Sequence, residues 1–74
     1  MKKDTEEEVV RLKQQLEKLK QQDQILSEIE NRLYEMKKIA EYATQHQLSP
    51  EESNRLNHEM HKHQTMVNEL ELLM

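Results

Sequence analysis

Apolar residues recur at spacings of three and four along most of the chain, which is the repeat of helices that pack through a coiled-coil seam. Three runs follow this repeat, over 9–19, 26–43 and 56–74. Their positions are Val9, Leu12, Leu16 and Leu19 in the first, Leu26, Ile29, Leu33, Met36, Ala40 and Ala43 in the second, and Leu56, Met60, His63, Val67, Leu70 and Met74 in the third. The pattern predicts an all-α protein.

The second run does not keep the register of the first. Between Leu19 and Leu26 the pattern skips, as if three residues were inserted in the polar segment 20–25. Such a discontinuity, called a stammer, locally overwinds a coiled coil. We therefore expect the first two runs to face different partners.

Two capping signals mark where helices begin. Thr5, with Glu8 three residues later, has the spacing of a capping box. Ser49 precedes Pro50 at the first helical position, and Glu52 completes a second capping box. The sequence therefore predicts an antiparallel two-helix hairpin in a single domain of residues 1–74, with a helix over 5–45, a turn at 46–48 and a helix over 49–73.

The two predicted helices differ in length, which leaves part of the first one uncovered. Folding back at the turn sets Leu33 near His63, Ile29 near Val67 and Leu26 near Leu70, while Met74 reaches only as far as Gln22. Residues 5–20 then form a projecting arm, in which residues 6–19 have no partner within the chain. An exposed apolar stripe of this kind typically marks an association site.

We expect the arms of two copies to pair as a coiled coil that continues into a four-helix bundle, or one copy to lay its arm on a different protein. The candidate self-association and partner-binding residues are Val9, Leu12, Leu16, Leu19, Leu26, Ile29, Leu33, Met36, Leu56, Met60, His63, Val67 and Leu70.

Composition supports association over an independent core. Of 74 residues, 34% are hydrophobic and 35% charged, with no Gly, one Pro and no Cys. Almost nothing interrupts a helix, disulfides are excluded, and a chain this short rarely builds enough core by itself. A homodimer is therefore the expected state.

Several function classes are disfavoured. No apolar run is long enough to span a bilayer, and no apolar stretch follows the first residues as in a signal peptide, so we expect a cytoplasmic protein without membrane contact. A net charge of -4 and the lack of a basic face argue against nucleic acid. Without a Gly-rich loop, a Cys or a Ser-His-acid arrangement, we expect no enzyme, no cofactor and no small-molecule substrate.

The histidines offer two further interpretations. His58 and His61 lie three apart, a spacing that can chelate a divalent ion, but no Cys or second His pair completes the ligand set. A solvated polar face is the expected outcome, with no metal. His63 instead interrupts an apolar seam, where a polar residue typically fixes register or oligomeric state.

Two stretches of sequence resemble known families. Leu26-Ser27-Glu28-Ile29, residues 33–36, Lys37-Lys38-Ile39-Ala40, Ala43, Ser49-Pro50-Glu51-Glu52, Leu56 and Glu59 resemble the helical hairpin in the rod of bacterial flagellin over 26–70, without gaps. The chain lacks flagellin's terminal regions, which build the filament core. The resemblance therefore implies a hairpin fold and not a filament subunit.

The turn Leu48-Ser49-Pro50-Glu51-Glu52 also resembles that of the small aspartyl-phosphate phosphatases of the sporulation relay, which are two-helix hairpins. Their signature Ser-Gln-Glu-Leu-Asp falls on residues 57–61, where only Glu59 is identical and His61 replaces the functional Asp. The resemblance implies binding to a response regulator without phosphatase chemistry.

Together these patterns predict a non-enzymatic adaptor or regulator that works by helix-mediated self-association and by binding another protein. Two alternatives stay open: a response-regulator-binding, phosphatase-like regulator of bacterial signalling, and a structural assembly protein of a phage or flagellar system.

Overall fold

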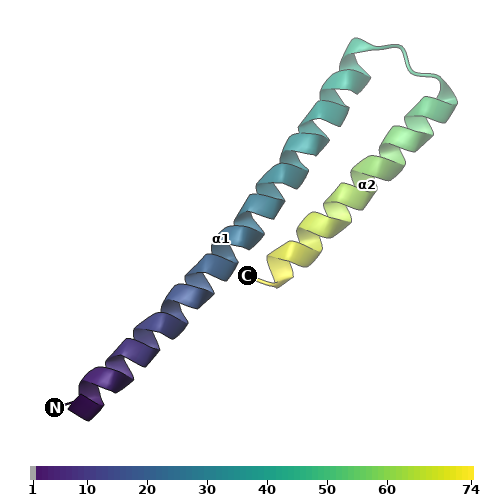
Figure 1. Cartoon of the computed structure of the whole chain (residues 1–74). Helices are drawn as coiled ribbons and strands as arrows, with labels where there is room; N and C mark the ends of the chain where they lie inside the picture. The colour runs from purple at the N-terminus through teal and green to yellow at the C-terminus, as the bar shows by residue number, and fades with distance from the viewer. Residues whose placement is uncertain (1) are drawn as a thin grey trace.

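The computed structural model describes residues 2–74, with side chains from Asp4 onward, as two α-helices and one connection. α1 spans Lys2–Gln45 and α2 spans Pro50–Leu72. α2 turns back and packs along the second half of α1, so the first part of α1 projects alone (Figure 1). No strand occurs between residues 2 and 74, which confirms the all-α prediction, and the molecule is a rod of 71 × 18 × 9 Å.

α1 begins earlier than the sequence pattern indicated. Its first residue is Lys2, so Thr5 lies inside the helix and the prediction that Thr5 is the N-cap is wrong. No Gly or Pro stands near this end to stop the helix from extending toward the N-terminus. Asp4 lies in the first turn, where a negative charge interacts favourably with the positive end of the helix dipole.

The connection is fixed by local chemistry at both of its ends. Ser49 has the extended backbone of an N-cap (φ -68°, ψ 160°), and its Oγ accepts a hydrogen bond from the Glu52 backbone N at 3.2 Å. Pro50 occupies the first helical position. On the other side, the His46 backbone N donates to the Tyr42 carbonyl at 3.1 Å, and the two rings stack with centroids 4.0 Å apart. The predicted cap at Ser49 is therefore present.

The two helices meet through a very small core. Ile29, Val67 and Leu70 are buried, and Ile25 and Met36 pack against them. Ile29 and Val67 belong to this one cluster, in agreement with the predicted pairing. Met74, which the sequence analysis placed at the end of the seam, is exposed.

The face that α1 turns toward α2 is rotated slightly from the predicted one. Ile29 and Met36 stay in the seam, but its other positions move back by one residue along the chain. Leu26 and Leu33 were expected in the seam, but 41% and 50% of their surfaces are exposed. Ile25, Arg32 and Ile39 are the half-covered residues instead. The seam of α1 is therefore Ile25, Ile29, Arg32, Met36 and Ile39, at spacings of four and three.

A polar contact gives the physical reason for this rotation. Nη1 of Arg32 lies 3.2 Å from Nδ1 of His63 across the two helices. A guanidinium only donates hydrogen bonds, so the imidazole nitrogen accepts here. The predicted register would have placed Leu33 against His63 and left a partly buried ring nitrogen without this partner, which costs free energy.

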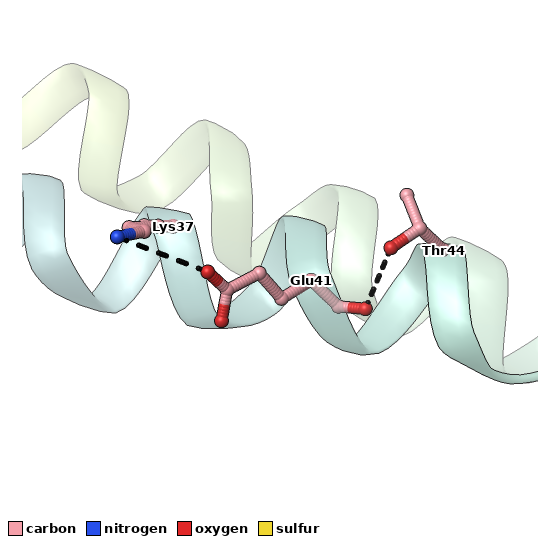
Figure 2. A network of polar contacts seen from close by, with 3 residues as sticks. All are labelled: Lys37, Glu41 and Thr44. Atoms are coloured by element: carbon pink, nitrogen blue, oxygen red, sulfur yellow. Dashed lines mark hydrogen bonds and ion pairs between the residues drawn. The ribbon is translucent and has the colours of Figure 1, made fainter.

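The exposed face of α1 near the turn carries local polar contacts. Nζ of Lys37 lies 3.9 Å from Oε1 of Glu41, and Thr44 Oγ1 donates to the Glu41 backbone carbonyl at 2.8 Å (Figure 2). Contacts between residues three and four apart stabilise a helix by only a few tenths of a kcal/mol, roughly 0.2–0.5 per pair. They support α1 locally and do not hold α2 in place.

Candidate interaction surface

α2 does not cover the first half of α1. The last residues of α2 reach the level of Gln21 and Ile25 on α1, where Leu70 and Leu73 line a shallow depression with them. Every residue from Asp4 to Gln24 is exposed. In Figure 1 this segment runs past the C-terminus as a single helix. The arm therefore projects as the sequence pattern predicted.

The arm presents an apolar row to solvent. The exposed fractions are 44% for Val9, 63% for Leu12, 52% for Leu16 and 57% for Leu19, so each side chain is covered only by its own helix. Their spacing of three, four and three places them on one side of the helix. Such a row has the geometry to pack into the groove of a second helix.

Charged residues of both signs flank the apolar row. Glu8 and Lys13 stand next to it in the heptad, and Arg11, Glu17 and Lys18 lie nearby in the sequence. All five are exposed. A partner helix would therefore meet an apolar centre with charges at its edges, the usual composition of a coiled-coil interface.

The other candidate residues divide between the core and the surface. The α2 positions Leu56, Met60, His63, Val67 and Leu70 are all buried or half-buried against α1, as are Ile29 and Met36 on the opposite side. Leu26 and Leu33 are exposed and lie outside the hairpin seam. Sequence reasoning missed Ile25, Arg32 and Ile39, although their spacing of seven was visible in the chain.

Arg32 and His63 form the polar layer of the hairpin seam, in a shallow hollow that they share with Glu28, Asn31 and Glu35. Among the side chains from Asp4 to Met74, no three His, Asp or Glu residues are grouped closely enough to hold a metal ion. His58 and His61 are both exposed. The Arg32–His63 contact joins α1 to α2.

We expect a measurable coupling between Arg32 and His63. Arg32→Met or His63→Leu alone removes one hydrogen-bonding partner, whereas the double variant replaces both with apolar groups and leaves neither unpaired. A double-mutant cycle from urea unfolding should give a coupling free energy of about 0.5–1 kcal/mol, since the pair is only partly buried. The control is the exposed pair Lys37 and Glu41, for which the coupling should be smaller. Additive effects at Arg32 and His63 would contradict this prediction.

Neither helix, over the residues described, has an apolar stretch long enough to cross a membrane.

No family model, curated protein or solved structure matches the chain. The resemblances to flagellin and to the sporulation-relay phosphatases therefore stay predictions from the residues that carry them.

Proposed function

We propose that this chain is a non-enzymatic protein-binding module, a small adaptor or regulator that acts by pairing its helices with those of a second copy and of another protein. The observation that carries the proposal is the exposed apolar row of Val9, Leu12, Leu16 and Leu19 on the part of α1 that projects beyond α2. Exposed apolar rows on soluble helices are normally covered by a partner.

The marginal stability of a lone helix supports the same conclusion. A helical segment without tertiary contacts is only marginally stable in water, because its hydrogen bonds barely offset the loss of backbone freedom. The arm is exposed along its whole length from Asp4, so packing against another chain is the available way to stabilise it.

The size of the intrachain core adds a second argument. Ile29, Val67 and Leu70 are the only buried apolar residues between Asp4 and Met74. Burying one such side chain stabilises by about 1.5–3 kcal/mol, whereas ordering the backbone costs about 1–2 kcal/mol for every residue. Association with another chain would cover apolar side chains of α1 that are exposed in the single chain, and would add to this small core.

The test compares the solution mass and helicity of the full chain with those of a chain lacking residues 1–20. The shortened chain keeps all three buried residues and the Ser49 cap. We expect light scattering to give two chains for the full protein at micromolar concentrations and one chain for the shortened protein. A full chain that stays monomeric and helical would contradict self-association, and the arm would then be tested for binding to a different protein.

A further inference from the structure

Four leucines lie seven residues apart along α1, and all of them are exposed. They are Leu12, Leu19, Leu26 and Leu33, with exposed fractions of 63%, 57%, 41% and 50%. Seven residues make almost two helical turns, so the four side chains form one leucine stripe with a slow left-handed drift of about 20° per heptad. The stripe is roughly 32 Å long at about 1.5 Å per residue.

The leucine stripe crosses the boundary between the arm and the hairpin without a break. Where α2 covers α1, it packs on Ile25, Ile29 and Met36, and Leu26 stands about 100° around the helix from Ile25. α1 therefore has two apolar rows in this region, one against α2 and one facing solvent. The apparent stammer between Leu19 and Leu26 arises when these two rows are read as one seam.

We propose that the leucine stripe is the interface for a second copy of this chain, as a parallel, in-register coiled coil of two α1 helices from Val9 to Leu33. This inference rests on the proposed self-association and adds its partner, direction and extent. In a two-fold symmetric pair of this kind each residue of the stripe meets its own counterpart. The second copy thus covers both the arm and the outer face of the hairpin.

The alternation of core positions favours the parallel direction. The two core positions of the heptad are filled, in order along the helix, by Val9, Leu12, Leu16, Leu19, Asp23, Leu26, Glu30 and Leu33. In the parallel pair every position except Asp23 and Glu30 forms an apolar layer. An antiparallel pair over the same span sets Leu12 against Glu30 and Leu19 against Asp23. Since this happens in both copies, four leucine side chains of the dimer face carboxylates, whereas none does in the parallel pair.

Flanking charges agree with the parallel direction. Glu8 and Lys13 are five residues apart, at the two positions that face each other across a parallel coiled coil. Each pair of arms therefore brings opposite charges together on both sides of the interface. In the antiparallel pair Lys20 would lie beside its own counterpart, and like charges repel. The parallel pair sets Asp23 against Asp23 and Glu30 against Glu30 of the second copy, so these two like-charged layers weaken it and the six apolar layers hold it together.

Single cysteines test the direction and the extent together, because the chain has no Cys of its own. Leu12→Cys probes the arm, Leu33→Cys and Leu26→Cys probe the hairpin, and Gln14→Cys lies on the opposite side of α1 as a control. A disulfide needs Cα atoms within about 7 Å, which a parallel in-register pair provides at each leucine. Under mild oxidation we expect all three leucine variants of the full chain to convert almost completely to covalent dimers, and Gln14→Cys to remain uncross-linked.

Other outcomes separate this inference from the proposed function. If Leu12→Cys cross-links but Leu26→Cys and Leu33→Cys do not, the arms pair and the extension along the hairpin is wrong. If none cross-links while light scattering of the reduced protein gives two chains, the chain self-associates in another direction or through another face, and the parallel stripe is wrong. A mass of one chain at every concentration overturns both proposals.

Discussion

Leu16→Ala is expected to raise the dissociation constant of the proposed dimer by about a thousandfold. Leu16 lies at the centre of the arm, and its side chain is half-exposed in the single chain. Each dimer would lose two leucine side chains from packed layers, and a buried Leu→Ala change costs about 2–5 kcal/mol. A combined loss of at least about 4 kcal/mol corresponds to three powers of ten in affinity. Light scattering or sedimentation over a concentration series measures the change.

Gln14→Ala is the matched control for this result. It lies in the same arm, introduces the same residue, and points away from the apolar row, so the dissociation constant should stay close to that of the unchanged chain. Because Ala favours helix more than either replaced residue, neither variant should lose helix by local propensity. An equal effect of both variants, or of neither, would show that the arm does not pair through this row.

Leu70→Ala is expected to detach α2 from α1. Leu70 belongs to a core of only three buried residues, and its removal should cost about 2–5 kcal/mol. Few other contacts hold the hairpin closed, so this loss is large compared with the docking free energy of α2. We expect the urea midpoint of the helical signal to fall sharply and amide protons of α2 to exchange faster.

Leu72→Ala provides the comparison within the same helix. Leu72 is 86% exposed, so the same substitution two residues further along removes almost no buried surface. Its urea midpoint should match that of the unchanged chain. If Leu72→Ala destabilised the protein as much as Leu70→Ala, the end of α2 would be packed against something other than the face of α1 described above.

Local chemistry explains which parts of the fold could be predicted. The Ser49 cap and Pro50 act within four residues, so the start of α2 follows from sequence alone. The seam of α2 was also predictable, because α2 has only one row of apolar residues long enough to pack. Thr5 is not the N-cap because the capping-box spacing marks only a position where a helix can begin. Nothing interrupts α1 there, and the helix extends three residues further toward the N-terminus.

The rotation of α1 could not be read from the sequence because α1 carries two adjacent apolar rows. Ile25 and Leu26 are neighbours in sequence, and either could begin a seam with the same spacing. The choice depends on a tertiary contact, the hydrogen bond of Arg32 to His63, which links residues 31 positions apart. The exposed arm was predictable for a simpler reason, since α2 is too short to cover α1. Neither helix carries a sequence pattern that identifies the partner protein.

The position of the turn at one end of a 71 Å rod has a consequence for binding strength. In a parallel pair both turns lie at the same end, so each copy presents its Tyr42–His46 ring stack at that end. A target with two copies of a weak site for this tip would bind the second turn intramolecularly, at the high effective concentration that a short, stiff connection provides. Its avidity would then exceed the affinity of either turn alone, and an antiparallel pair, with its turns at opposite ends, would lose that gain.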